Sequence, residues 1–188
     1  MQLARITMQN TSEYIVFDIE TQKSFDEIGG RYNLPKMGLS VAVVYDSRTG
    51  ETSAFREHDV DKLVHVLETA PKIVGFNILQ FDYRVLQGYS DFAFNSLPTV
   101  DLMQHVVNAL GFRLSLDNLA QATLKAGKSS SGLQAIEWYR QGEWEKLIAY
   151  CRDDVLITRD LYEFGKMNGH VVYYDRKFRT QKKLKVQW

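Results

Sequence analysis

Three runs of β-branched and aromatic residues precede any helical pattern, and this order constrains the fold more than any other feature of the chain. The runs cover residues 14–20, 39–46 and 51–56, and a turn through residues 47–50 joins the last two. Runs of this kind, bounded by turn residues, are typical of β-strands. We therefore predict that the chain opens with three strands.

Helical patterns predominate from residue 59 onward. In residues 59–70 the apolar side chains recur at helical spacing until Pro71, and the short apolar run 72–76 then predicts another strand. Further helices are expected near residues 80–88, 101–110, 115–125, 133–140 and 143–165. This order predicts an α/β fold with a mixed central sheet, three antiparallel strands and then a parallel strand, flanked by helices.

The length of 188 residues, 45% of them apolar, is enough for one well-cored domain. We assign residues 1–175 to this domain and residues 176–188 to a basic C-terminal tail. The tail carries six basic and no acidic residues, so the remainder has 17 basic and 23 acidic groups and a net charge of −6. The tail is either a solvated terminus or an arm that contacts phosphates or a partner.

Cys151 is the single cysteine, which excludes an internal disulfide and argues against a structural zinc site. No stretch approaches the roughly 18 apolar residues of a membrane-spanning helix. The first ten residues lack the apolar block of a secretory signal. We therefore predict a cytoplasmic protein that does not act at a membrane.

Two carboxylates, Asp18 and Glu20, end the first apolar run. Because side chains alternate along a strand, both acids point to one face of the sheet. Carboxylates this close repel each other unless a proton or a cation lies between them, and oxygen ligands suit Mg²⁺ or Mn²⁺. The alternative is that the strand ends at Phe17 and leaves both acids in a solvated loop.

A third acid, Asp82, lies in the segment GFNILQFDYRVL. By itself it is explained as a first-turn acid favoured by the positive end of a helix, and Asn77 as a turn or cap residue. The connection from residue 21 to 38 is long for a compact domain and directly follows the paired carboxylates. It is a candidate for shaping their substrate site.

Helical periodicity separates the neighbouring acids Asp153 and Asp154. At about 100° per residue, Asp154 lies at the centre of an apolar stripe, whereas Asp153 lies about 100° to one side. Tyr150, one turn earlier, shares the face of Asp154. A buried carboxylate needs a partner, and the alternative to a metal ion is a salt bridge to a distant basic residue.

The segments FDIET, NILQFD and YCRDD occur in this order, with the last on a late helix. Together they resemble the three motifs of the DEDDy branch of DnaQ-like 3′-to-5′ exonucleases, in the RNase H-like superfamily. YCRDDVL and GFNILQFD are similar to the proofreading domain of family B DNA polymerases. The GGR of the 21–38 connection and the basic tail more loosely resemble free-standing or helicase-associated bacterial exonucleases. Ala149 stands where a sister branch has histidine, so Tyr150 marks the tyrosine type and no histidine is needed for catalysis.

The resemblance implies an RNase H-like fold and hydrolysis of phosphodiester bonds at a single-stranded 3′ end, with two Mg²⁺ or Mn²⁺ ions as cofactors. DNA is the favoured substrate and a helicase is a candidate partner. The implied metal ligands are Asp18, Glu20, Asp82 and Asp154. Tyr150 would orient the attacking water through its hydroxyl. A phenol with an ordinary pKa of about 10 is mostly a neutral donor at pH 7 and does not act as a strong base.

Contacts to the strand are expected from stacking on aromatic side chains and from polar groups. Phe25 is the stacking candidate, although it could equally anchor the loop on the core, and Thr21 and Asn77 are candidates for polar contacts. Two rival functions are a structure-specific endonuclease and a non-catalytic module that binds nucleic acid or a helicase. Tyr150 disfavours the first, and the complete set of acids disfavours the second.

Two other patterns have simpler explanations. The segment AGKSSSG at 126–132 contains GKS, but Ala122 stands where a phosphate-binding loop needs glycine, so we predict a loop between helices. Asp101 opens a predicted helix with Gln104 three residues later. This spacing favours an N-cap over a fifth catalytic acid.

Overall fold

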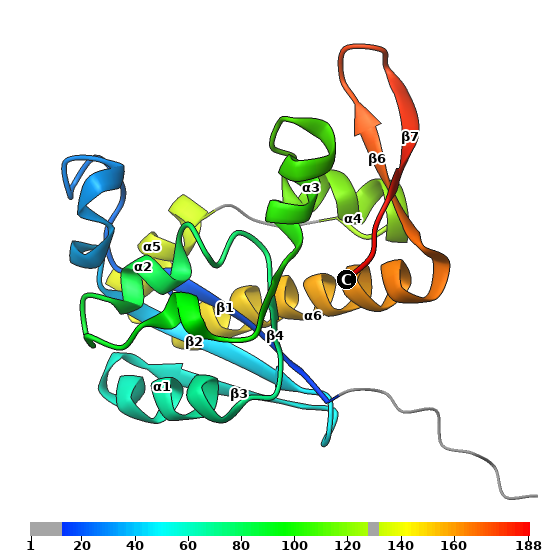
Figure 1. Ribbon diagram of the computed structural model, residues 1–188. Coiled ribbons are helices and arrows are strands. Elements are labelled where there is room, and N and C mark those ends of the chain that lie inside the picture. Colours follow the sequence, from blue (N-terminus) through cyan, green and yellow to red (C-terminus); the bar gives the residue numbers. More distant parts are fainter. Residues whose placement is uncertain (1–12, 128–131) are drawn as a thin grey trace, which may run out of the picture.

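The computed structural model describes residues 13–127 and 132–188 (Figure 1). The N-terminal segment that we predict to lack a secretory signal lies outside these residues, as does most of the GKS segment. Within the described part of the chain, no helix is both long enough and apolar enough to cross a membrane.

The strands and the short 3₁₀ helices set the frame of the fold. The strands are β1 (Ile15–Thr21), β2 (Leu39–Asp46), β3 (Glu51–Arg56), β4 (Ile73–Gly75), β5 (Thr99–Asp101), β6 (His170–Asp175) and β7 (Thr180–Lys185). The 3₁₀ helices are η1 (Arg31–Lys36), η2 (Glu57–Asp59) and η3 (Phe94–Ser96).

The α-helices follow the sequence-based prediction closely. They are α1 (Val60–Thr69), α2 (Asp82–Leu86), α3 (Leu102–Leu110), α4 (Leu116–Leu124), α5 (Gly132–Gln141) and α6 (Trp144–Asn168). Helix α6 runs to Asn168, beyond the predicted end at residue 165, and it stops where Gly169 caps it in the left-handed region.

Five strands form one sheet in the order β3-β2-β1-β4-β5. β1 and β2 pair antiparallel, as do β2 and β3, whereas β4 pairs parallel with both β1 and β5. The predicted α/β fold with a mixed sheet and flanking helices is therefore confirmed. Strand β5 was not predicted from the sequence.

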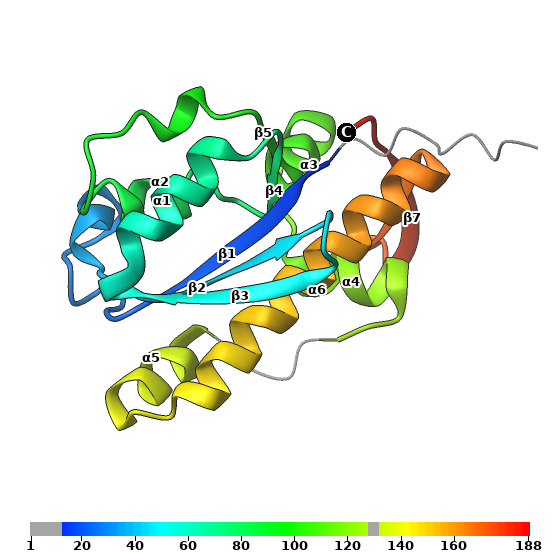
Figure 2. The same ribbon diagram turned by 90° about the horizontal axis from the view of Figure 1, so that it is seen from below.

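Helices cover both faces of this sheet (Figure 2). Ile15, Phe17 and Ile19 belong to the core that includes α1 and α2, whereas Val16 belongs to the core that includes α6. Alternation along β1 thus continues through Thr21, and the expected face for Asp18 and Glu20 is the one that α6 covers. The alternative in which the strand ends at Phe17 is wrong.

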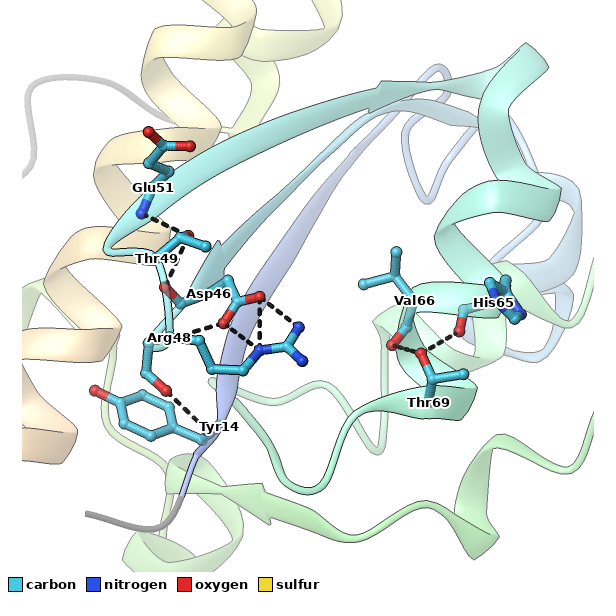
Figure 3. A network of polar contacts seen from close by, with 9 residues as sticks. Tyr14, Asp46, Arg48, Thr49, Glu51, His65, Val66 and Thr69 are labelled. Atoms are coloured by element: carbon cyan, nitrogen blue, oxygen red, sulfur yellow. Dashed lines mark hydrogen bonds and ion pairs between the residues drawn. The ribbon is translucent and has the colours of Figure 1, made fainter. Parts of the chain in front are cut away.

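The turn between β2 and β3 is closed by side chains (Figure 3). The Asp46 carboxylate accepts hydrogen bonds from the backbone N–H of Arg48 at 2.8 Å and from its guanidinium at 2.6 Å. Thr49 Oγ1 accepts from the N–H of Glu51 at 3.2 Å, and the N–H of Tyr14 donates to Ser47 Oγ at 2.9 Å. The turn therefore also fixes the start of β1.

The connection from residue 21 to 38 is folded against the body. Ile28, Leu34 and Met37 are buried in the core on the α1 side. Gly88 packs against the backbone carbonyl of Pro35, where any β-carbon would clash, so η1 and α2 lie in close contact. Arg140 on α5 also forms an ion pair with Glu27 at 2.6 Å. The connection is thus a structured wall beside the end of β1.

Strands β6 and β7 form a separate two-stranded hairpin beside α4 and the C-terminal part of α6 (Figure 1). The N–H and carbonyl of Tyr174 bond to the Asn118 side chain at 2.9 and 3.0 Å, and those of Val172 to Thr123 Oγ1 at 2.9 and 2.8 Å. The pairing of β6 with β7 crosses the predicted boundary at residue 175, and the division into domain and tail stays a prediction.

Candidate metal centre

The end of β1 and the middle of α6 bring three carboxylates together. Ligand oxygens of Asp18, Glu20 and Asp154 all lie within 4.8 Å of one another. Two of the acids share a face because they are two residues apart on a strand, and the third arrives because α6 packs across β1. Oxygen donors at this spacing match the ligand chemistry of a hard divalent cation.

The register of α6 follows the sequence-based helical wheel. Asp154 is only 5% exposed, whereas its neighbour Asp153 is exposed. Tyr150 is also buried, and its ring packs edge-on against Trp138 with 5.9 Å between ring centroids. The prediction that Asp154 lies at the centre of the apolar face and Asp153 to one side of it is confirmed.

Asp82 is the most deeply buried carboxylate of the region, with 2% exposure. Its Oδ1 accepts a hydrogen bond from the N–H of Ile19 at 3.1 Å, which ties the start of α2 to β1. Burial raises the pKa of Asp82 well above its usual range, and the nearby Asp18 carboxylate raises it further. A nearby cation would favour the ionised form of both acids.

Asp101 is a buried N-cap, as expected. Its carboxylate accepts from the N–H groups of Met103 and Gln104 at 2.9 and 3.3 Å. It also accepts from those of Asn77 and Leu79 at 2.8 and 3.0 Å, which the sequence does not reveal. Asp101 thus holds the turn that leads into α2, and it positions the segment that carries Asp82.

Replacement of Asp101 by alanine is expected to lower the free energy of unfolding by about 2–4 kcal/mol, because four backbone N–H groups lose their acceptor. Urea unfolding measures the change. Asp117, a half-buried acid in the first turn of α4 whose carboxylate accepts a hydrogen bond from the Gln121 side chain, offers the control, and Asp117→Ala should cost much less. Equal losses for the two variants would contradict this role for Asp101.

Cys151 lies directly behind the carboxylates. Its Sγ donates to the carbonyl oxygen of Asp18 at 3.4 Å, and the thiol is fully buried. Burial raises the pKa of the Cys151 thiol well above its usual range, and the carboxylates of Asp18, Glu20 and Asp154 add to this effect. The thiol therefore stays protonated in this environment and packs α6 onto β1.

An open cavity of about 640 Å³ lies over the carboxylates. Every candidate site residue from the sequence lines it: Asp18, Glu20, Thr21, Phe25, Asn77, Asp82, Tyr150 and Asp154. Asp26 lines it as a fifth acid that the sequence analysis missed, although its place beside Phe25 was a usable signal. None of the described lining residues is basic, so this candidate catalytic cavity is strongly acidic.

The three candidate substrate contacts line this cavity. Phe25 packs against Phe81 at 5.9 Å between centroids, and the Arg31 guanidinium lies 5.2 Å from the Phe25 ring. Asn77 adopts a positive φ of 72°, a conformation that asparagine tolerates well, and so serves as a turn residue. Phe25 thus both anchors the loop and lines the cavity; substrate contact by Thr21, Phe25 and Asn77 stays a prediction.

A five-stranded mixed sheet with an acidic cluster at the end of its central strand defines an RNase H-like α/β protein. A family model of the RNase H superfamily matches residues 15–164, which include all of the candidate site residues. The chain therefore belongs to the RNase H superfamily.

A solved structure of the family B DNA polymerase from the hyperthermophilic archaeon Pyrobaculum calidifontis is similar to this chain, with a TM-score of 0.61 and 18% sequence identity. The similarity covers 81% of this chain but only 24% of the polymerase, so the chain spans about a quarter of that protein. At this identity the likeness concerns the fold. No curated protein matches the chain.

Proposed function

We propose that this protein is a metal-dependent 3′-to-5′ exonuclease that hydrolyses phosphodiester bonds at a single-stranded 3′ end, with DNA as the favoured substrate. The observation that carries the proposal is the convergence of Asp18, Glu20 and Asp154 within 4.8 Å, in a cavity that Asp82 and Tyr150 also line. The resemblance to DEDDy exonucleases and membership of the RNase H superfamily support the same chemistry.

The donor set fits a pair of Mg²⁺ or Mn²⁺ ions. Asp18, Glu20 and Asp154 would hold one ion, and Asp82 together with Asp18 would hold the other. Bound ions would supply charge neutralisation on the attacking and leaving oxygens and would lower the pKa of a water molecule. They would also reverse the local charge of this acidic cavity, which otherwise repels a polyanion.

Beside the metal ligands, the Tyr150 side chain would orient the reacting water molecule. The Tyr150 hydroxyl, one helical turn before Asp154, would hold the attacking water in line with the terminal phosphate. Water adds to phosphorus, the bond to the 3′ oxygen of the penultimate nucleotide breaks, and that oxygen takes a proton. The products are a 5′-mononucleotide and a strand shortened by one nucleotide with a free 3′ hydroxyl.

Tyr150→Phe should lower kcat by about 100-fold, because the hydroxyl orients the water while the ring maintains the contact with Trp138. Isothermal titration with Mn²⁺ should show unchanged metal binding, since the carboxylates remain. Tyr139, a tyrosine on α5 that does not line the catalytic cavity, provides the control variant Tyr139→Phe. A full-activity Tyr150→Phe enzyme would remove this residue from the mechanism.

Oligonucleotides labelled at the 5′ end test the activity directly, in Mg²⁺ or Mn²⁺ and in EDTA. A ladder that shortens from the 3′ end, together with release of 5′-mononucleotides, is expected with metal and should vanish with the chelator. Internal cuts would indicate an endonuclease. Failure to cut single-stranded DNA or RNA with either metal would refute the proposed function.

A further inference from the structure

Two more cavities continue from the catalytic cavity toward the C-terminal hairpin. The first, of about 530 Å³, shares Phe25, Asn77 and Phe81 with the catalytic cavity and is otherwise lined mainly by η1 and α2. The second, of about 730 Å³, lies between the α3–α4 connection and the β6–β7 hairpin, and it shares Arg113 with the first.

Arg113 connects these cavities physically. Its guanidinium donates to Asn77 Oδ1 at 2.6 Å, and Asn77 lines the catalytic cavity. Arg113 follows the end of helix α3 at Leu110. Its side chain therefore reaches from the cavity beside the hairpin to Asn77 at the catalytic cavity. The two cavities together form a continuous surface that we call the basic groove.

The charge of the basic groove is opposite to that of the catalytic cavity. Its lining includes a single acid, Asp175, which pairs with Lys182 at 2.8 Å. The other basic residues that line the groove are Arg31, Arg84, Arg113, Arg176 and Lys177. None of these five forms an ion pair with a carboxylate among residues 13–127 and 132–188. Five cations without a protein counterion in this region fit a polyanionic ligand.

Exposed aromatic side chains gather along the same surface. Of the six large hydrophobic side chains that are exposed in the described chain, four line the basic groove: Tyr32, Phe112, Tyr174 and Phe178. Tyr32 is 95% exposed and Phe178 is 62% exposed. Aromatic rings interleaved with cations are the combination that binds single-stranded nucleic acid, with bases on the rings and phosphates on the cations.

The hairpin is held rigidly enough to act as one wall of this groove. Asn118 and Thr123 on α4 satisfy backbone groups on the outer edge of β6, and Leu184 on β7 is buried in the core. The turn at residues 176–179 forms the tip of the hairpin (Figure 1). Arg176, Lys177 and Phe178 of this turn line the groove. The family model ends at residue 164, so membership of the superfamily assigns nothing to this hairpin.

We propose that the basic groove binds the single-stranded DNA upstream of the 3′ end, with the β6–β7 hairpin as its distal clamp. Arg113, Arg176 and Lys177 contact phosphates, and the exposed rings stack on bases. The proposal rests on the proposed exonuclease function, because it takes the catalytic cavity as the place of the 3′ terminus. It gives the basic tail a role in substrate binding.

The test is the double variant Arg176→Ala with Lys177→Ala, measured by fluorescence anisotropy on labelled oligothymidylate of about 20 nucleotides with phosphorothioate linkages at its 3′ end. Affinity should fall by about tenfold. The slope of log affinity against log salt should become shallower by about 1.4, at about 0.7 for each lost phosphate contact. Phe178→Ala should lower affinity while it leaves this slope unchanged.

The double variant Arg48→Ala with Lys62→Ala is the matched control, because it removes two exposed cations from the β2–β3 turn and α1, outside the groove. It should keep the wild-type slope, and thermal unfolding verifies that both double variants are folded. If the folded Arg176→Ala, Lys177→Ala variant keeps the wild-type slope of log affinity against log salt, the hairpin does not bind the strand, even if the enzyme cuts DNA. Loss of binding in a protein that cuts nothing would support the groove and refute only the nuclease.

Discussion

Asp18→Ala and Asp154→Ala should each abolish cleavage, with a loss of at least about 1,000-fold in kcat/KM. Each change removes an oxygen ligand from the cluster within 4.8 Å, and a loss of this size corresponds to about 4 kcal/mol of transition-state stabilisation. Folding should be little affected, because both changes remove a carboxylate that neighbouring carboxylates repel. The cleavage ladder on a labelled oligonucleotide measures the activity, and titration with Mn²⁺ should show weakened metal binding.

Asp153→Ala provides the control for Asp154, because it removes the same chemical group from the next position on α6. Asp153 is exposed and lies to one side of the apolar face of α6 that carries Asp154, so this variant should retain nearly full activity. If Asp153→Ala were inactive and Asp154→Ala active, the assignment of the metal ligands on α6 would be wrong.

Asp82→Asn should abolish cleavage and, at the same time, stabilise the metal-free protein by about 1–2 kcal/mol. The asparagine keeps an oxygen that can accept the N–H of Ile19, while it removes the ionisable group whose charged form is disfavoured by burial and by Asp18. A carboxylate kept at this cost in stability is expected where it serves a bound cation. Excess Mg²⁺ should reduce the difference, because ion binding stabilises the wild type more than the variant.

Urea unfolding in EDTA and in Mg²⁺ measures both parts of this prediction. Asp26 lines the same cavity but is exposed, so Asp26→Asn should change the free energy of unfolding little in either buffer. A destabilised Asp82→Asn protein, or one that still cuts DNA at the wild-type rate, would show that Asp82 has a purely structural role.

The sequence predicted the longer elements because their signals are local. The limits of β2 and β3 agree with the runs 39–46 and 51–56, and α3 to α5 agree within about two residues. Strand β5 was missed because three residues, Thr99–Asp101, are too short to show alternation. It is a strand only because β4 lies beside it and supplies the hydrogen bonds.

In the candidate site, too, some positions could be predicted from local sequence patterns and others depend on tertiary contacts. The central position of Asp154 and the peripheral position of Asp153 could be read from helical periodicity, whereas Asp82 was unremarkable by itself. The resemblance to DEDDy exonucleases named Asp82 as a ligand, but only the structure shows how it is held beside β1, by a hydrogen bond from the N–H of Ile19 across 63 positions of the chain. Asp101 was readable as an N-cap, but its hold on Asn77 and Leu79 depends on the parallel pairing of β4 and β5.

The sequence by itself determined which side chains share a face. Asp18 lies with Glu20, and Tyr150 with Asp154, because backbone geometry sets periods of about 2 residues in strands and about 3.6 in helices. Only the tertiary structure decided how far apart those faces lie, and it also placed the cations of the C-terminal hairpin on a surface that continues from the candidate catalytic cavity. Such distances arise from burial of side chains remote in sequence, and no local pattern of residues encodes them.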